Sequence, residues 1–253
     1  MKTMKIMINR CPLKPELFAL LTFALLSFHA KSLAQVKDST TIKSLIKTEI
    51  LPASLIGAGS IISGSLFEKN MQTNLRNTVG NGYEFRIDDY MQYAPVAELY
   101  LADLCGVKAK NHWFDQTKYL IISNVITASI THGLKFLTLK TRPTGARFSF
   151  PSGHTTLAFT NATVLYHEFN ETSPLLAYSG FAFSTATASF RMINNKHWLS
   201  DVMVGAGIGL LVTHLVYHFE PLKNFNPLKK DIKITIIPLF DDHNPGLYAV
   251  YSF

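Results

Sequence analysis

Cysteine and charge are both scarce in this chain of 253 residues. Cys11 and Cys105 are the only cysteines, so a disulfide scaffold and a zinc site built from cysteines are excluded. Charged residues make up 16% of the chain and hydrophobic residues 47%, a balance that excludes an intrinsically disordered protein. The sequence contains no internal repeat. Its length suffices for one large domain or two small ones, with a core that needs no covalent staples.

A basic run that could follow a nucleic-acid backbone is also absent, although the formal net charge is +7. Residues 1–34 contribute +4 of this charge, because they contain five Lys or Arg residues and a single Glu. The rest of the chain carries only +3, and its basic residues are not interleaved with aromatic ones. We therefore expect no nucleic-acid partner.

The N-terminus has the parts of a secretory signal peptide. Four Lys or Arg residues precede the apolar stretch Leu17–Phe28, and small residues occupy the −3 and −1 positions of a cleavage site before Gln35. This pattern predicts a signal peptide at 1–34, followed by a polar segment at 35–49. An uncleaved first membrane span is the alternative, but twelve apolar residues are short for a span.

Six apolar segments of helical rather than strand length predict an all-α fold, a six-helix bundle over residues 50–219. The intervening loops, such as Asn70–Asp89 and Gly106–Lys118, hold most of the charge. Glycines at four-residue spacing, such as Gly205 and Gly209, favour close packing of helix backbones. The predicted helices are Ile50–Phe67, Tyr93–Cys105, Tyr119–Leu139, Thr155–Phe169, Leu175–Phe190 and Leu199–Phe219.

The C-terminal tail, residues 220–253, has a different character. Ile232–Phe240 and Leu247–Phe253 are rich in β-branched and aromatic residues, and they flank a turn-forming stretch at 241–246. This pattern predicts a short β-hairpin, in which Pro238 indicates an edge strand. A single hairpin cannot close a membrane barrel.

Polar residues that can carry out chemistry gather in three motifs at the ends of the predicted helices. Each motif has an ordinary structural interpretation: a cationic helix end, a helix start, and an i,i+4 surface pair. Together, however, the three motifs supply every part of one reaction. They are Lys135-x6-Arg142-Pro143, Pro151-Ser152-Gly153-His154 and Arg191-x5-His197-x3-Asp201.

That reaction is phosphoryl transfer, in which the protein mainly positions the phosphoryl group and stabilises the charge on its three equatorial oxygens. The motifs contain three cations for this purpose, two of them arginines that can bind as bidentate forks. The backbone amides of Ser152 and Gly153 lie at a predicted helix N-terminus and can form an anion nest, with the Ser152 hydroxyl as a further donor. The three cations are Lys135, Arg142 and Arg191.

Two histidines can divide the bond-making and proton-transfer steps. His197 lies one helical turn before Asp201, so the carboxylate can fix its tautomer and leave the other ring nitrogen as a nucleophile. His154 can protonate the leaving oxygen and later activate water. The sequence shows no carboxylate cluster for magnesium and no His or Cys spacing for zinc. We therefore expect neither a metal nor another cofactor, with the cations in the metal's place.

This constellation resembles the type 2 phosphatidic acid phosphatase (PAP2) superfamily, which includes bacterial acid phosphatases and vanadium haloperoxidases. The three motifs span Lys135 to Asp201 in the family's order, and the helical pattern extends the resemblance over about residues 50–219. Phe190 stands where the family usually has a serine, which removes a possible phosphate donor and puts a hydrophobic ring by the site.

The resemblance implies a role for each site residue. His197 is the implied nucleophile, which passes through a phosphohistidine, Asp201 orients it, and His154 is the implied acid and base. The residues implied to bind the substrate phosphate are Lys135, Arg142, Ser152, Gly153 and Arg191.

The family contains both membrane-embedded lipid phosphatases and soluble periplasmic enzymes. Tyr119–Leu139 and Leu199–Phe219 are long enough to cross a bilayer, whereas Tyr93–Cys105 is short and carries Glu98 and Asp103. If Tyr93–Cys105 lies in the membrane interface, all three motifs face the periplasm.

We therefore expect an exported, membrane-associated, metal-independent phosphatase with a periplasmic active site. Its expected substrate is a lipid phosphate: phosphatidic acid, phosphatidylglycerophosphate, an isoprenyl pyrophosphate or lipid A.

Three alternatives stay open at this point. One is a soluble periplasmic acid phosphatase of broad specificity, which a carbonate wash would release from the membrane. Another is a vanadium haloperoxidase, although such chains are usually much longer. The third lies outside the enzymes: a membrane scaffold that retains the motif, which inertness towards every phosphoester and a stable partner would indicate. The oligomeric state is open in all of them.

Overall fold

The computed structural model describes residues 39–80, 82–219, 222, 233–241 and 244–252. The chain divides into a helical unit that ends at His218 and a C-terminal unit that begins at Phe219. The predicted signal peptide, its cleavage site and the start of the polar segment lie outside the described residues.

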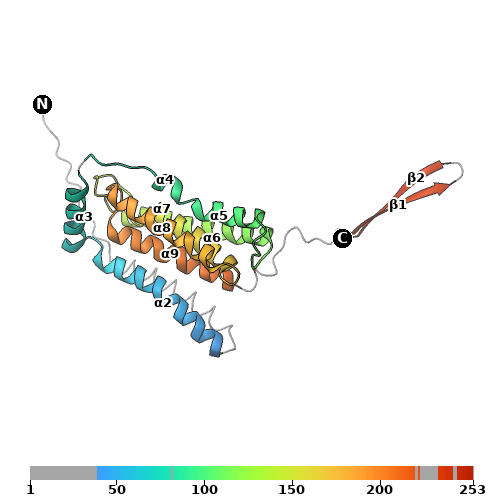
Figure 1. Ribbon diagram of the computed structural model, residues 1–253, viewed down its shortest axis with the longest axis horizontal. Coiled ribbons are helices and arrows are strands. Elements are labelled where there is room, and N and C mark those ends of the chain that lie inside the picture. Colours follow the sequence, from blue (N-terminus) through green and yellow to red (C-terminus); the bar gives the residue numbers. More distant parts are fainter. Residues whose placement is uncertain (1–38, 81, 220–221, 223–232, 242–243, 253) are drawn as a thin grey trace. The chain divides into compact units, whose positions relative to one another are not determined.

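Eight helices lie in the described part of the helical unit (Figure 1), so the predicted count of six is wrong. The first begins at Ser39 rather than at Ile50, and the charged stretch Asn70–Asp89 holds most of one helix and the start of another. The helices are α2 (Ser39–Ile62), α3 (Leu66–Val79), α4 (Asp88–Met91), α5 (Ala94–Leu104), α6 (Trp113–Thr138), α7 (Gly153–Phe169), α8 (Pro174–Ile193) and α9 (Leu199–His218).

Helix α3 is absent from the predicted set because it is polar and is held by capping rather than by an apolar face. The Ser65 side chain accepts a hydrogen bond from the backbone N–H of Glu68, at 3.2 Å. The Glu68 carboxylate in turn accepts one from the N–H of Gly64, at 2.7 Å. This arrangement is close to a capping box, in which a Ser and a Glu three residues later satisfy unpaired amides at a helix start.

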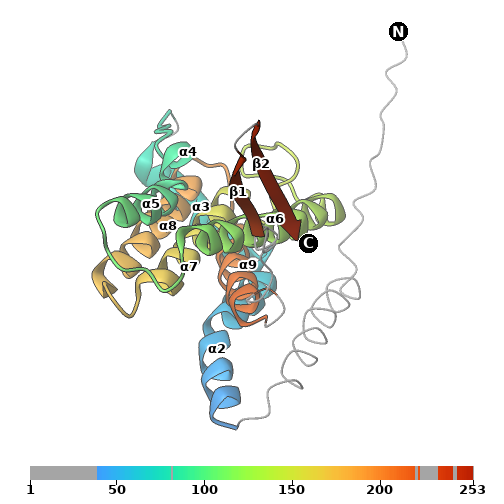
Figure 2. The same ribbon diagram turned by 90° about the vertical axis from the view of Figure 1, so that its right-hand side faces the viewer.

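Helix α7 lies in the interior of the bundle, where it packs against α6, α8 and α9. On another face of α9 lies α2, so α9 is enclosed between α2 and α7 (Figures 1 and 2). Most side chains of α9 are buried as a result, and this helix is also the most apolar of the set. The interior of the bundle is thus built around α7 and α9, which both begin at the same end.

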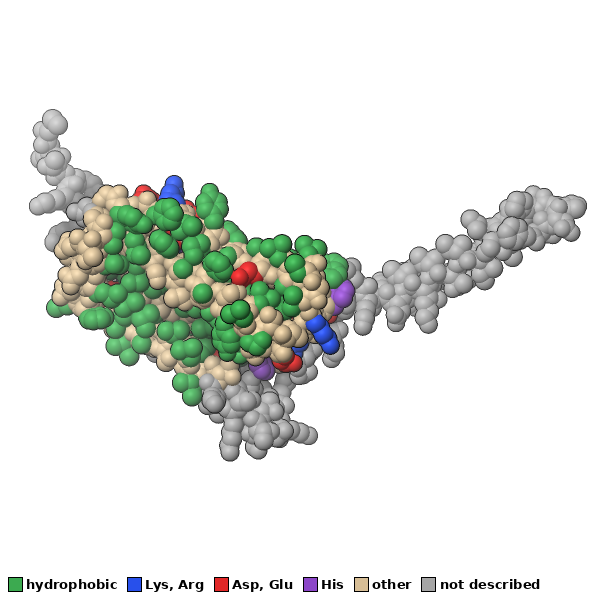
Figure 3. Space-filling view, in the orientation of Figure 1, with side chains coloured by type: hydrophobic (Ala, Val, Ile, Leu, Met, Phe, Trp, Pro, Cys, Tyr) green, Lys and Arg blue, Asp and Glu red, His purple; other side chains and the backbone are tan. Residues whose placement is uncertain are grey.

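Of the described helices, α6 and α9 are long and apolar enough to cross a membrane, and Thr48–Ile62 of α2 together with α3 would add a third span, bent by 91°, if the pair crosses together. Large apolar side chains are exposed on several helices, and Figure 3 shows a face of the molecule with many hydrophobic and few charged side chains. On α6 these exposed side chains are Trp113, Ile121, Val125, Ile126, Phe136 and Leu137. Contiguous apolar surface of this kind marks contact with lipid or with another protein.

Glycines on α9 bring three helix backbones close together, which confirms the packing role predicted for them. A Cβ atom on Gly205 would lie 2.8 Å from the carbonyl oxygen of Ser152, and one on Gly209 would lie 2.8 Å from that of Thr156. Both contacts are with the start of α7. On another side of α9, a Cβ on Gly207 would lie 2.8 Å from the carbonyl oxygen of Pro52 in α2.

The C-terminal unit contains a two-stranded antiparallel sheet of β1 (Lys233–Asp241) and β2 (Asn244–Ser252). Its register pairs Lys233 with Ser252 at one end and Asp241 with Asn244 at the other. Pro238 lies in β1, opposite Leu247.

Replacing Gly209 with alanine should lower the free energy of unfolding by about 1–3 kcal/mol, because an added methyl group has no space against α7. Thermal unfolding of the purified protein in detergent measures this loss. Gly57→Ala is the matched control, since nothing lies within 4 Å of a Cβ built at this position of α2. The control should keep or raise the melting temperature, and equal melting temperatures for the two variants would contradict the packing role.

Candidate active site

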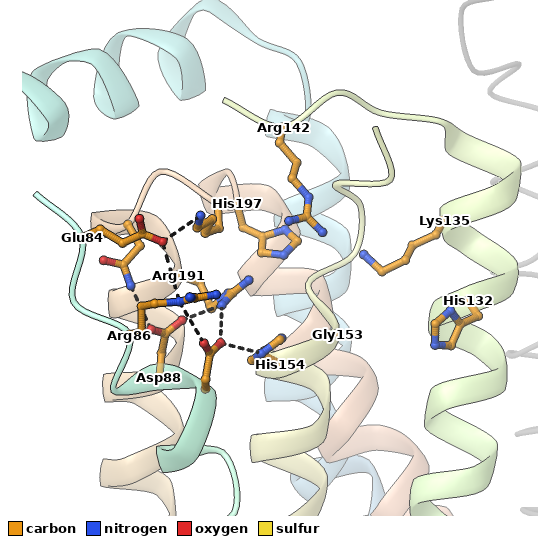
Figure 4. Close-up of a pocket in the computed structure, with 13 residues that line it drawn as sticks. Glu84, Arg86, Asp88, His132, Lys135, Arg142, Gly153, His154, Arg191 and His197 are labelled. Carbon is orange, nitrogen blue, oxygen red and sulfur yellow. Dashed lines mark hydrogen bonds and ion pairs between the residues drawn. The ribbon is translucent and has the colours of Figure 1, made fainter. Parts of the chain in front are cut away.

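A cavity of about 500 Å³ lies at the end of the bundle where α7 and α9 begin and where α6 and α8 end. Six of the eight predicted site residues line it, together with charged residues that the motifs do not include. Figure 4 shows the Lys135, Arg142 and His197 side chains pointing toward one another from three different segments. The six predicted residues in the lining are Lys135, Arg142, Gly153, His154, Arg191 and His197.

The imidazole of His197, the predicted nucleophile, is deeply buried, with 1% of the residue exposed. Its Nδ1 lies 3.4 Å from Oδ2 of Asp201, so the predicted pair is formed. Burial lowers the pKa of His197 to about 4 against the opposing effect of Asp201, which leaves the ring neutral at neutral pH. With its proton on Nδ1, facing the carboxylate, the ring presents the Nε2 lone pair for attack.

Hydrogen bonds to both oxygens hold the Asp201 carboxylate at the first turn of α9. Besides His197, the backbone N–H of Trp198 donates to Oδ2 at 3.0 Å, and the Ser149 hydroxyl donates to the same oxygen. The Lys140 ammonium donates to Oδ1 at 3.0 Å. Because both oxygens are occupied, the carboxylate is fixed in orientation, and the His197 ring is fixed with it.

Lys140 also belongs to a buried ion cluster that joins α3 to α9. Its Nζ lies 3.2 Å and 3.1 Å from the two carboxylate oxygens of Glu68 and 2.6 Å from the hydroxyl oxygen of Ser200. Glu68 accepts a further hydrogen bond from the Ser200 N–H at 3.0 Å. One ammonium is therefore shared between two buried carboxylates, those of Glu68 and Asp201.

Lys135 and Arg142 approach the cavity from the end of α6 and from the loop that follows it. The Lys135 ammonium donates a hydrogen bond to the carbonyl oxygen of Phe148 at 2.8 Å, and this contact directs the lysine side chain toward the C-terminal part of the loop. Burial, and then the charge of Arg191, lower the pKa of Arg142. Its Nε has no hydrogen-bond partner among the described residues. An incoming anion would supply that partner and the missing negative charge.

Arg191 lies at the end of α8 and is clamped by two acidic residues of α4. Its Nη1 donates to Asp88 at 2.6 Å and to Asp89 at 3.3 Å. Asp88 is 1% exposed and also accepts a hydrogen bond from the Asn194 amide at 2.8 Å. The Nε of Arg191 has no partner within the described part of the chain, so one side of the guanidinium is still free to bind an anion.

Phe190 is not in the cavity lining, which corrects the expectation of a hydrophobic ring by the site. Its ring lies 5.8 Å from the ring of Phe85, centroid to centroid. Asn194 also holds Phe85, since their backbone and amide groups form hydrogen bonds of 3.0 Å and 2.9 Å. Phe190 thus helps to attach the segment before α4, which carries Asp88 and Asp89, to the end of α8.

The second motif, Pro151-Ser152-Gly153-His154, contributes fewer residues to the cavity lining than predicted. Ser152 is fully buried and is the N-cap of α7, where its hydroxyl accepts hydrogen bonds from the N–H and the hydroxyl of Thr155. Its backbone N–H donates to the carbonyl oxygen of Asp201 at 2.9 Å. The structure therefore does not bring the Ser152 donors to the cavity, and Gly153 and His154 represent this motif in its lining.

The charge of the cavity favours a doubly charged anion. Its lining contains five Lys or Arg side chains and three Asp or Glu side chains, a surplus of two positive charges when the histidines are neutral. A phosphate monoester carries close to two negative charges at neutral pH. The residues that the motifs missed are Glu84, Arg86, Asp88, Asp89, His132, Asn194 and Lys196.

Little in the sequence indicated that these residues would line the cavity. Lys196 directly precedes His197, but the acidic residues lie more than 40 residues before the first motif, in a stretch expected to be a loop. Among the residues that the structure describes, no group of three His, Cys, Asp or Glu side chains is arranged to hold a metal ion.

The fold and the cavity define a class: an all-helical domain with a cationic cavity and a His–Asp pair at the ends of its inner helices. The family model of the PAP2 superfamily matches residues 116–225 of the chain. The chain belongs to the PAP2 superfamily, as the three motifs predict.

A lipid A 1-phosphatase from Porphyromonas gingivalis is 30% identical over 184 residues, which are 69% of this chain and 40% of that protein. The chain thus spans less than half the length of this relative. Two crystal structures are similar at lower identity. LpxE of Aquifex aeolicus has 20% identity, covers 58% of this chain and 94% of its own, and has a TM-score of 0.44. A transmembrane PAP2 type phosphatidylglycerolphosphate phosphatase from Bacillus subtilis has 17% identity, covers 81% of this chain and 98% of its own, and has a TM-score of 0.42.

Replacing Lys140 with alanine should destabilise the protein by about 3–5 kcal/mol, because Glu68 and Asp201 would be left as two buried, uncompensated carboxylates. Chemical unfolding in detergent measures the loss. Lys110→Ala is the matched control: the Lys110 side chain is 52% exposed and its pair with Glu171, at 3.6 Å, is a surface pair. The control should cost about 0–1 kcal/mol. A similar loss in both variants would contradict the role of the buried cluster.

Proposed function

We propose that this protein is a metal-independent phosphatase that removes phosphate from a membrane lipid through a phosphohistidine intermediate. The observation that carries the proposal is the buried, neutral His197, held by Asp201, at a cavity with two surplus positive charges. A neutral imidazole beside a cationic anion site is the arrangement that nucleophilic attack on a phosphate ester requires.

The proposed first step transfers the phosphoryl group to the enzyme. Lys135, Arg142 and Arg191 bind the phosphate oxygens, and the Nε2 atom of His197 attacks phosphorus. The bond between phosphorus and the ester oxygen breaks as the new P–N bond forms. His154 gives its proton to the leaving oxygen, so the lipid departs as an alcohol, or as a monophosphate when the substrate is a pyrophosphate.

The proposed second step returns the enzyme to its starting state. His154, now neutral, takes a proton from a water molecule, and the resulting hydroxide attacks the phosphohistidine. The P–N bond breaks and inorganic phosphate leaves, while Asp201 stabilises the positive charge that His197 carries as a phosphoenzyme. The same cations bind phosphorus-bound oxygens in both steps, so no metal ion is needed.

A lipid substrate is supported by the apolar exposed surface and by the two helices long enough to span a bilayer. Among lipid phosphates we place the phosphate of lipid A first, because the relative from Porphyromonas gingivalis is a lipid A 1-phosphatase. Phosphatidic acid, phosphatidylglycerophosphate and an isoprenyl pyrophosphate are the other candidates. We further propose that residues 1–34 direct export, so that the cavity faces the periplasm.

Phosphate release from a panel of substrates tests this proposal. The purified full chain in detergent should release phosphate from lipid A or another lipid phosphate more efficiently than from p-nitrophenyl phosphate. His197→Ala should lower the rate by more than about 1,000-fold, because it removes the nucleophile. His154→Ala should accumulate phosphohistidine with a good leaving group, since that variant lacks the base for the second step.

Full activity in His197→Ala would refute the assignment of the nucleophile. Efficient release from p-nitrophenyl phosphate with poor release from every lipid would instead indicate a periplasmic phosphatase of broad specificity. The assays should contain EDTA, and loss of activity in its presence would contradict metal independence.

The rate should also depend on pH with a maximum on the acidic side. His197 must be neutral to attack, and its pKa of about 4 means that activity is lost as the pH falls through that value. His154 must be protonated to act as an acid. Burial, and then the charge of Arg191, lower its pKa below the ordinary 6.5, so activity is lost as the pH rises through this range.

The pH dependence of kcat/KM reports these groups in the free enzyme and should therefore show a maximum between about pH 4 and 6.5. A maximum above pH 8 would contradict the roles of the two histidines.

A further inference from the structure

Asp89 is the one acidic residue of the cavity that contacts a histidine with a proposed role in proton transfer. Its Oδ1 lies 3.1 Å from Nε2 of His154 and 3.3 Å from Nη1 of Arg191. Its other oxygen, Oδ2, lies 3.5 Å from Nε of Arg86. The carboxylate thus joins the proposed acid to a phosphate-binding arginine, and it comes from α4, outside the three motifs.

The contact with Asp89 determines which ring nitrogen of His154 carries the proton when the ring is neutral. An ionised carboxylate only accepts hydrogen bonds, so the Nε2 atom that faces it must be the donor. Nδ1 is then the nitrogen that exchanges a proton with the leaving oxygen. His197 has the same arrangement in mirror order, because Asp201 faces its Nδ1 and leaves Nε2 for attack.

Asp88 and Asp89 have different surroundings, which separates their functions. Asp88 is almost fully buried and is occupied by Arg191 and Asn194, so it stabilises the end of α8. The side chain of Asp89 is 36% exposed and makes weaker contacts with Arg191. A partly exposed carboxylate in a cavity built for anions opposes phosphate binding, and its position therefore needs a reason other than stability.

We propose that Asp89 is a positioning residue for His154, which fixes the ring orientation and tautomer that protonate the leaving oxygen. This inference rests on the proposed phosphatase activity and adds to it a second His–Asp pair. Protonation matters most when the leaving group is a poor one, such as the alkoxide of a lipid, and little when it is a phenolate that leaves without help. Asp89 therefore adapts the site to lipid phosphates rather than to activated esters.

The charged groups around His154 agree with this role. Asp88 and Asp89 of α4 favour its protonated form, and Arg191 of α8 opposes it. The remaining titratable groups of the cavity come from α6 and from the loops. They are His132, Lys135, Arg142, Glu84, Arg86, Lys196 and His197. Without Asp89, the nearest favourable charge is lost, and the pKa of His154 should fall further below its ordinary value.

The test is the dependence of kcat/KM on the leaving group in Asp89→Asn, because kcat/KM reports the steps up to departure of the leaving group and excludes the hydrolysis of the phosphoenzyme. Wild type and variant are compared on a lipid phosphate, an alkyl phosphate and a series of aryl phosphates with leaving groups of decreasing acidity. The variant should lose about 10-fold or more in kcat/KM on the lipid and alkyl phosphates, but less than about 3-fold in kcat/KM on p-nitrophenyl phosphate. Asp89→Glu, which keeps the carboxylate, should recover part of the loss.

A double-mutant cycle separates an effect through His154 from general damage to the site. If Asp89 acts through His154, adding Asp89→Asn to His154→Ala should cause no further loss of rate. An equal loss on all substrates, or a further loss in the double variant, would overturn the proposal. A higher kcat/KM in Asp89→Asn would also overturn it, because Asp89 would then only compete with the phosphate.

A measurement without substrate keeps the inference separate from the proposed function. NMR titration of histidine-labelled protein, with the His154 signal assigned by its absence in His154→Ala, should give a lower pKa for His154 in Asp89→Asn than in wild type. An unchanged pKa would overturn the inference whatever the activity. Wild-type protein without phosphoenzyme or phosphate release would refute the proposed function, while the titration would still decide the pairing of Asp89 with His154.

Discussion

The arrangement of the cavity depends on one buried carboxylate, that of Asp201 at the first turn of α9. It accepts hydrogen bonds from a ring nitrogen of His197, from Ser149, from Lys140 and from the backbone of Trp198. These donors come from two loops that are more than 40 residues apart in sequence. The carboxylate therefore fixes the loop after α6 against the start of α9. A buried carboxylate is tolerated there because both of its oxygens accept hydrogen bonds and one donor is a cation.

A second set of contacts holds the opposite wall of the cavity. Arg191 is paired with Asp88 and Asp89, and Asn194 and Phe190 attach the segment before α4 to the end of α8. The arginine proposed to bind phosphate on this side is thus pre-positioned by carboxylates that neutralise part of its charge. The Nε of Arg142, like that of Arg191, has no hydrogen-bond partner among the described residues, but of the two arginines it is Arg191 that is clamped by Asp88 and Asp89. The two arginines consequently differ in how much they gain from an anion.

The sequence was sufficient to predict the family and six of the cavity residues, because residues such as Lys135, Arg142 and His197 lie at fixed spacings beside apolar helices. The acidic residues were not predictable, since Glu68 lies in a polar helix and pairs with a lysine 72 positions later. Asp89 likewise reaches His154 across 65 positions. Such pairs depend on how helices pack, which spacing does not encode. Ser152 shows the converse: it is a residue of the right type in the right motif, but it is fully buried, its hydroxyl accepts hydrogen bonds at the helix start, and its backbone N–H already donates to a neighbouring carbonyl oxygen.

The glycines of α9 restrict how the catalytic end of the domain can evolve. With α2 on one face and α7 on another, both at backbone contact distance, α9 can neither rotate nor slide without collision. The position and direction of the first turn of α9, which carries Asp201, are therefore set by the packing of the helix backbones. Glu84, Arg86 and Lys196 line the cavity from loops, outside these contacts between helix backbones. The domain thus combines a His–Asp pair held at the start of a tightly packed helix with a cavity border formed by loops.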